Sequence, residues 1–211
     1  MDSKNASKSK PSRRERSKAD KMRRILAAGE KLFTKQGYDG TTVQQIADEA
    51  DIAVGTLFLY VSDKSELLLK IFYNATDHEL EPAIRRMKAS RKFLPGARRF
   101  LMELHAPYGK DRELAKVYCR EVLFHKGGVR AELDKQSAEI VGALAEAIAV
   151  AQQRGDIDKS VDPSVGALHF YAIFHATLAF HVADCLPNTT PNQTLNALLQ
   201  SAWFGMASRH S

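Results

Sequence analysis

The chain has 211 residues, of which 44% are hydrophobic, enough for one large domain or for a small domain joined to a larger one. Its two cysteines exclude a disulfide-rich scaffold and fit a reducing cytosol. The formal net charge of +6 belongs to one end, because residues 1–24 hold ten basic and three acidic side chains. A basic end of this kind suits a polyanion, either nucleic acid or an acidic membrane surface.

The first part of the chain predicts a basic arm and two helices. Residues 1–17 are rich in Ser, Lys and Arg, and we expect them to be disordered when unbound. Apolar or small residues then share one face of a helix that Gly37 ends, namely Ile25, Gly29, Leu32 and Phe33. Thr42 and Gln45 form a capping box, which predicts the start of a second helix.

A third short helix is expected over residues 54–60, after a tight turn. Asp63, with Glu66 at the capping-box position, predicts a long helix to about residue 90 in which Pro82 makes a kink. Further helices are expected at about residues 95–107, 112–126, 130–154, 163–185 and 192–208. No convincing two-residue alternation of apolar residues appears, so the predicted fold is all-α.

Three short helices within about fifty residues, the last two joined by a three-residue turn, predict a helix-turn-helix. The third helix of such a unit lies in the major groove of DNA, and a glycine there lets the backbone approach closely. We assign this role to Gly55, which otherwise weakens a helix interior by about 1 kcal/mol. The alternative is a helical hairpin inside an ordinary bundle, with Gly55 at a helix crossing.

These elements predict three parts. Residues 1–17 form the arm, residues 18–64 a three-helix helix-turn-helix DNA-binding domain, and residues 65–211 a C-terminal helical bundle for ligand binding and dimerisation.

The segment "GYDGTTVQQIADEADIAVGTLFLYVSDKSELL" resembles the DNA-binding domain of the TetR (tetracycline repressor) family of transcriptional regulators. The resemblance covers about residues 18–72. Its features are Gly37-Tyr38, Thr41-Thr42-Val43, Ile46-Ala47, Gly55-Thr56-Leu57, Phe58 and Lys64. The family implies a homodimer whose third helices enter successive major grooves of a palindromic operator. It also implies that the C-terminal helices enclose a pocket for a small, largely apolar effector.

The resemblance also implies which residues contact DNA. Thr42 and Lys64 would bind phosphate, Gln44 would reach a base or phosphate, and Tyr60 stands where the family often has a phosphate-contacting histidine. The full set is Thr42, Gln44, Gln45, Ala53, Val54, Gly55, Thr56, Leu59, Tyr60 and Lys64. The groove-facing Val54 and Leu59 are apolar, so we expect contacts with thymine methyls and phosphates to outweigh hydrogen-bonded readout.

The arm is expected to add minor-groove or phosphate contacts, above all through Arg13, Arg14 and Arg16. A solvated tail is the alternative, since basic tails are common.

Candidate ligand-binding residues follow from polar groups on an apolar stripe. Tyr118, Glu121 and His125 fall within one narrow arc of the predicted helix 112–126, and His105 is a similar candidate on the preceding helix. The alternative is that Glu121 and His125 form an i,i+4 pair at the rim of the bundle.

Catalytic and metal sites are not predicted. Three histidines, at residues 169, 175 and 181, point about 120° apart around one helix and cannot hold one ion. No nucleophile elbow or phosphate loop occurs, so we expect no cofactor and no enzyme activity.

The predicted helices at 163–185 and 192–208 are apolar nearly all round, and a second copy of the chain is the natural cover. The alternatives are the core helix of a monomer and, less favoured on polarity and flanks, a membrane span. The sequence thus predicts a cytoplasmic homodimeric repressor whose effector moves the long helix through Pro82. The alternative function is a ligand-sequestering helical protein, or an enzyme with a vestigial DNA-binding domain.

Overall fold

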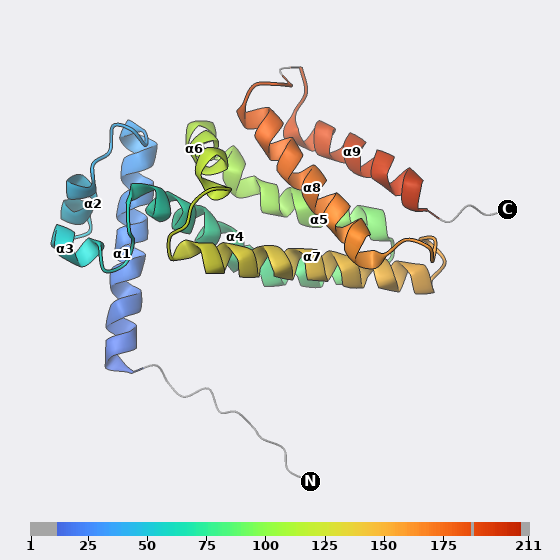
Figure 1. The fold of residues 1–211 in the computed structure, drawn as a ribbon, viewed down its shortest axis with the longest axis horizontal. Coiled ribbons are helices and arrows are strands. Elements are labelled where there is room, and N and C mark those ends of the chain that lie inside the picture. Colours follow the sequence, from blue (N-terminus) through green and yellow to red (C-terminus); the bar gives the residue numbers. More distant parts are fainter. Residues whose placement is uncertain (1–11, 187, 208–211) are drawn as a thin grey trace, which may run out of the picture.

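The computed structural model describes residues 12–186 and 188–207. Over these residues the chain forms nine α-helices and one short 3₁₀ helix, which confirms the predicted all-α fold. In chain order they are α1 (Arg13–Gln36), α2 (Val43–Glu49), α3 (Val54–Leu57), α4 (Lys64–Lys88), α5 (Phe93–His105), η1 (Ala106–Gly109), α6 (Arg112–Val122), α7 (Val129–Gln153), α8 (Pro163–Val182) and α9 (Pro191–Met206). Figure 1 shows α1–α3 at one end of an elongated molecule and α5–α9 at the other, with α4 joining them.

The N-terminal unit forms where the sequence predicts it. Gly37 ends α1 with a φ of 79°, in the left-handed region that glycine adopts without strain. Thr42 and Gln45 form the expected capping box at the start of α2, each side chain bonding the other's backbone N–H. Ile25, Ile46 and other apolar side chains of α1–α4 are completely buried between these helices, so the unit has a core of its own.

α1 begins inside the segment that was predicted to be a disordered arm. Ser12 and Glu15 form a capping box, and α1 therefore begins at Arg13. Arg13, Arg14 and Arg16 lie exposed in its first turns, so the expectation of disorder was wrong for residues 13–17. The rest of the predicted arm, residues 1–11, lies outside the described residues.

Several other helices end earlier than predicted, among them α8, which stops at Val182 where residue 185 was predicted. The third helix stops at Leu57, and residues 58–60 continue as hydrogen-bonded turns. α6 stops at Val122, whose carbonyl accepts a hydrogen bond of 2.7 Å from the Arg130 guanidinium. The apolar Leu123 and Phe124 are exposed in the loop that follows.

The C-terminal bundle is built around α7 and α8. α8 packs between α7 and α9, with Phe170, Phe174 and Leu178 buried. In the described part of the chain, α8 is the one helix long and apolar enough to cross a membrane by length and composition. One side of α8 packs against α7 and α9, and 44% of its apolar stretch is buried.

The start of α4 differs from the prediction in one contact. Asp63 caps α4 as expected, accepting a hydrogen bond of 2.7 Å from the Glu66 N–H. The Glu66 carboxylate, however, does not return to Asp63. It accepts from the backbone N–H groups of Ser62 and Val129, so it reaches the first residue of α7.

The crossing of α1 on α4 yields a stability test. A Cβ at Gly29 would lie 2.8 Å from Leu67 Cδ2 and 3.2 Å from Ile71 Cδ1. Overpacking should therefore make Gly29→Val less stable by about 1–3 kcal/mol. Gly142→Val in α7 has open space around its Cβ and should stay within about 0.5 kcal/mol of wild type. Chemical denaturation at one protein concentration measures both, and equal effects would contradict tight packing at Gly29.

Candidate functional site

Helix α3 is presented to solvent at the tip of the N-terminal unit (Figure 1). Leu57 anchors the helix in the core, whereas the side chain of Leu59 is 80% exposed and that of Phe58 is half exposed. Gly55 is exposed, and no atom lies within 4 Å of the position a Cβ would take. This excludes the alternative that Gly55 serves a helix crossing within the described chain.

The N-terminal turn of α3 has the properties of an anion site. Its N-cap residue is Ala53, which offers no side-chain oxygen to the first amide groups. Val54 and Thr56 are half-buried beside the exposed Gly55. The N–H groups of Thr56 and Leu57 already donate to the Ala53 carbonyl, so those of Val54 and Gly55 are the ones that phosphate oxygens can bind here.

The turn between α2 and α3 is braced from α1. Asp51 adopts a φ of 53°, a left-handed conformation that Asp tolerates better than most residues. The Arg24 guanidinium donates a hydrogen bond of 3.0 Å to the Asp51 carbonyl and lies 3.5 Å from its carboxylate. Sequence reasoning missed Arg24, because a contact across 27 residues has no local signal.

The polar candidates of α2 are exposed but already bonded within the protein. Gln45 Oε1 accepts hydrogen bonds of 2.9 Å from the Thr42 N–H and from Gln36 Nε2. Gln44 donates to the Asp48 carboxylate at 2.8 Å. Gln45 thus supports the helix start, whereas Gln44 can exchange its exposed partner for another acceptor.

Lys64 is held between two elements of the N-terminal unit. Its ammonium donates to the carbonyls of Tyr38 at 2.7 Å and of Thr41 at 2.9 Å, and it lies 4.2 Å from the centre of the Tyr38 ring. These bonds use two of its three N–H groups, which leaves one for a phosphate. Tyr60, close in sequence, is half-buried. Sequence reasoning missed the Tyr38 platform.

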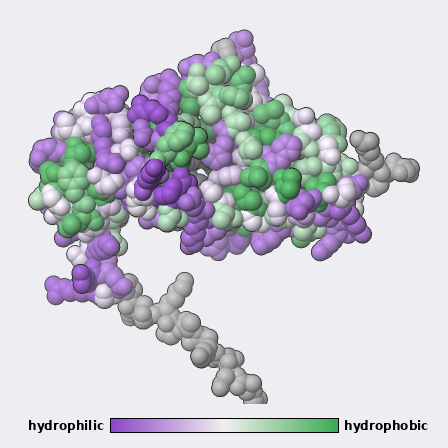
Figure 2. Space-filling view, in the orientation of Figure 1, coloured by the Kyte–Doolittle hydropathy of each residue, from purple (hydrophilic) through white to green (hydrophobic). Residues whose placement is uncertain are grey.

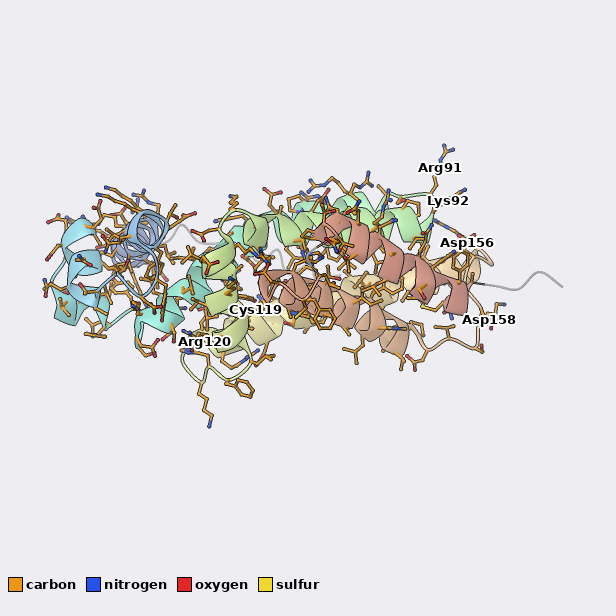
Figure 3. The ribbon with its side chains drawn as sticks, turned by 90° about the horizontal axis from the view of Figure 1, so that it is seen from above. Arg91, Lys92, Cys119, Arg120, Asp156 and Asp158 are labelled. Atoms are coloured by element: carbon orange, nitrogen blue, oxygen red, sulfur yellow. The ribbon has the colours of Figure 1, made fainter. Side chains whose placement is uncertain are left out.

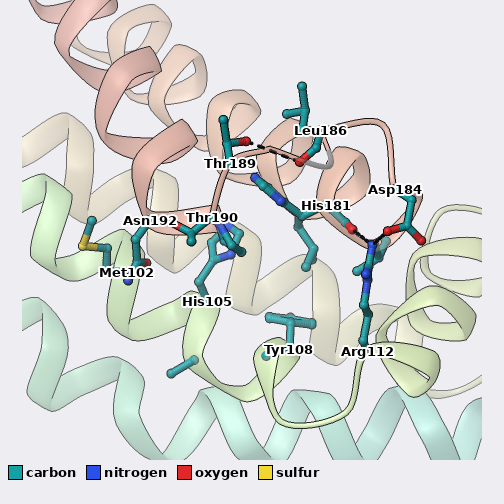
Figure 4. Close-up of a pocket in the computed structure, with 15 residues that line it drawn as sticks. Met102, His105, Tyr108, Arg112, His181, Asp184, Leu186, Thr189, Thr190 and Asn192 are labelled. Atoms are coloured by element: carbon teal, nitrogen blue, oxygen red, sulfur yellow. Dashed lines mark hydrogen bonds and ion pairs between the residues drawn. The ribbon is translucent and has the colours of Figure 1, made fainter.

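A second candidate site is a cavity of about 540 Å³ in the C-terminal bundle. α5, η1, the start of α6, the end of α8 and the start of α9 surround it (Figure 4). Its walls include the apolar Met102, Leu178 and Val182. At its edge the Arg112 guanidinium bonds the Asp184 carboxylate and the His181 carbonyl, which joins α6 to the end of α8.

Of the predicted ligand residues, His105 lines this cavity. Burial lowers the pKa of its ring, and Nε2 lies 3.0 Å from the Phe174 carbonyl, so the neutral ring donates there and Nδ1 is left as an acceptor. Tyr118 is buried behind the cavity, with its ring centre 4.9 Å from those of Tyr108 and Phe72.

Glu121 and His125, the other candidate ligand residues, do not line this cavity. Glu121 pairs with Arg120 at 2.9 Å, and Figure 3 shows Arg120 at the end of α6 beside the start of α4. His125 lies beyond the end of α6, with Nδ1 3.3 Å from the Ser65 hydroxyl. Both belong to the junction between the two halves. Among the described residues, no group of three or more His, Cys, Asp or Glu side chains is arranged to hold a metal.

Comparison with known proteins supports the family resemblance. Residues 25–71 match the model of the tetR family of bacterial regulatory proteins. The HTH-type transcriptional regulator HbdR of Aromatoleum sp. (strain CIB) is 38% identical over 58 residues, 28% of this chain and 25% of HbdR. The HTH-type transcriptional repressor KstR of Rhodococcus jostii (strain RHA1) is 30% identical over 118 residues, 55% of this chain and 54% of KstR. The chain thus spans a quarter to about half of these relatives.

A solved structure extends the likeness of fold to both halves of the molecule. Thermus thermophilus FadR, a TetR family repressor solved in complex with lauroyl-CoA, superposes with a TM-score of 0.73 at 20% sequence identity. The match covers 90% of this chain and 97% of FadR. It confirms the predicted order of an N-terminal helix-turn-helix and a C-terminal helical domain.

The open surroundings of Gly55 separate folding from binding. Gly55→Ala should unfold at or slightly above the wild-type temperature, since alanine favours a helix by about 1 kcal/mol. Its affinity for an operator duplex should fall about tenfold, because the methyl group meets the DNA backbone. Gly142→Ala, an exposed helical glycine on α7, is the matched control and should bind as wild type does. Fluorescence anisotropy measures the DNA affinity of wild type and of both variants, and thermal unfolding measures their stability. Unchanged binding by Gly55→Ala would remove this residue from the interface.

Proposed function

We propose that this chain, a TetR-family regulator by its DNA-binding domain and its fold, is a cytoplasmic homodimeric repressor that a small apolar effector releases from its operator. The observation that carries the proposal is the exposed first turn of α3, with Gly55 open to solvent on a scaffold braced by Arg24 and Lys64. The relative KstR is itself named a repressor.

DNA binding rests on two kinds of contact. The apolar Leu59 suits thymine methyl groups, and the first-turn amides of α3 suit phosphates. The exposed Arg13, Arg14 and Arg16 at the start of α1 supply positive charge on the same unit. Because these arginines stand on a helix and not on an extended arm, we propose that they contact phosphates rather than the minor groove.

The dimer is proposed through α8 and α9. Figure 2 shows hydrophobic surface over these helices, and the side chains of Val165, Leu168 and Phe204 are 67%, 58% and 73% exposed. Exposed apolar surface of this kind on neighbouring helices marks an interaction site. A second copy would cover it and place two recognition helices on one duplex.

The effector is proposed to occupy the cavity between α5 and α9. Its apolar walls suit a hydrocarbon chain, and Arg112 at its edge suits an anionic group. The structurally similar FadR binds lauroyl-CoA, so an acyl-CoA is the class of effector that we propose first. Because Arg112 belongs to α6, a ligand that displaces Asp184 from it would move this helix.

A gel shift on the duplex upstream of the chain's own gene tests DNA binding. Wild type should bind as a dimer, and its affinity should fall steeply with salt. Lys64→Ala should bind all sequences more weakly, with a salt slope flatter by about one unit if its third N–H holds a phosphate. Lys88→Ala, at the far end of α4, is the control and should change neither quantity. A monomeric wild type that ignores every duplex at low salt would contradict the proposed function.

The effector assignment has its own test. Lauroyl-CoA should release wild type from its operator at micromolar concentration. Ala106 is exposed and lines the cavity, so Ala106→Trp should fill it without disturbing the core. This variant should bind DNA normally but should no longer respond. Release of both wild type and Ala106→Trp would contradict the assigned cavity. Release of neither would contradict the proposed ligand class.

A further inference from the structure

A buried carboxylate joins the two halves of the molecule at the start of α4. The Glu66 side chain is on helix α4, and the residue is only 3% exposed. One carboxylate oxygen accepts a hydrogen bond of 2.7 Å from the Ser62 N–H, in the loop that follows the recognition helix. The other accepts a hydrogen bond of 2.9 Å from the Val129 N–H, the first residue of α7.

These contacts keep the buried group ionised. Burial by itself raises the pKa of Glu66, but the bonds from Ser62, the nearby Lys70 ammonium and the bond from Val129 together hold it below its ordinary value. A negative charge at this place also faces the positive end of the α7 dipole.

The start of α7 is built to receive this carboxylate. α7 has 25 residues, and its N-cap residue, Gly128, supplies no side-chain hydrogen bond of its own. Glu66 therefore provides the cap from another helix. A Cβ at Gly127 or Gly128 would lie 3.1 Å from a Glu66 oxygen, so the two glycines leave the room that the carboxylate needs.

A second polar contact lies one turn further along both helices. The Lys70 ammonium, on a buried residue, bonds both oxygens of Glu132 at 3.0 Å. Two contacts one turn apart fix the rotation of α4 against α7 as well as their separation. Because α7 packs along α8, this junction connects the recognition helix to the helix proposed for the dimer.

We propose that Glu66 is a positioning residue for DNA binding, which sets the spacing and orientation of the two recognition helices by capping α7 from α4. The inference rests on the proposed function. Lys64 joins α4 to the α1–α2 loop, and Glu66 joins it to α7, so a movement of the helix-turn-helix relative to α7 changes the contact with Val129.

The spacing of operator half-sites tests this role. A duplex is first selected by the wild-type dimer from a random pool, and its central spacer is then lengthened or shortened by one and two base pairs. Wild type should lose about tenfold in affinity or more when the spacer changes, because one half-site no longer meets its recognition helix. Glu66→Gln sets an amide N–H₂ against a backbone N–H. The ratio of its affinities for the selected and the altered spacers should be roughly tenfold smaller than that of wild type.

Controls separate positioning from stability. Glu146→Gln removes a carboxylate that also joins α7 to α4, through an exposed contact with Lys88, and should keep the wild-type spacer profile. Gly128→Ala keeps the charge, and its backbone is already helical, so it should fold while its Cβ crowds Glu66. It should broaden the spacer profile as Glu66→Gln does.

A uniform loss of affinity on all spacers in both variants would show a merely structural role and overturn the inference, as would two unchanged profiles. Failure of the wild type to select any duplex would instead overturn the proposed function, and this inference with it.

Discussion

The first two turns of α4 hold the molecule together, because their side chains bond in opposite directions. Lys64 donates to two carbonyls of the α1–α2 loop, and Glu66 accepts from the first residue of α7. Leu67 and Leu68, which follow Glu66 in the chain, are completely buried. A buried carboxylate such as that of Glu66 is costly without partners, so both halves are constrained to keep this arrangement. The position of α4 therefore sets the orientation of α3.

The cavity is connected to this junction through α6. One end of α6 holds Arg112, which bonds Asp184 at the edge of the cavity. The other end holds Arg120 and Glu121, whose charges act on Tyr38 of the α1–α2 loop, and burial with the Glu121 carboxylate raises the pKa of this tyrosine to about 12. A ligand that shifts α6 would thus change the charges that face Tyr38. We propose this path through α6, which packs against α4, in addition to the movement of α4 about Pro82 expected from the sequence.

Local signals explain what the sequence could predict. The capping box of Thr42 and Gln45, the stop at Gly37 and the cap at Asp63 each lie within a few residues, so element order and most boundaries were accessible. Glu66 was expected to complete a local box but bonds a residue 63 positions away. Partners at this distance in sequence are set by packing. The same limit applies to Arg24 with Asp51, and to the end of α6.

The central claim is that the junction fixes the separation of two recognition helices in a dimer. Pulsed electron resonance between spin labels at Leu59→Cys in the two protomers, with Cys119 and Cys185 replaced, measures this separation in the free protein. The account predicts one narrow distance distribution near the roughly 34–36 Å between successive major grooves. A distribution spread over tens of ångströms, or no interaction between labels, would contradict it.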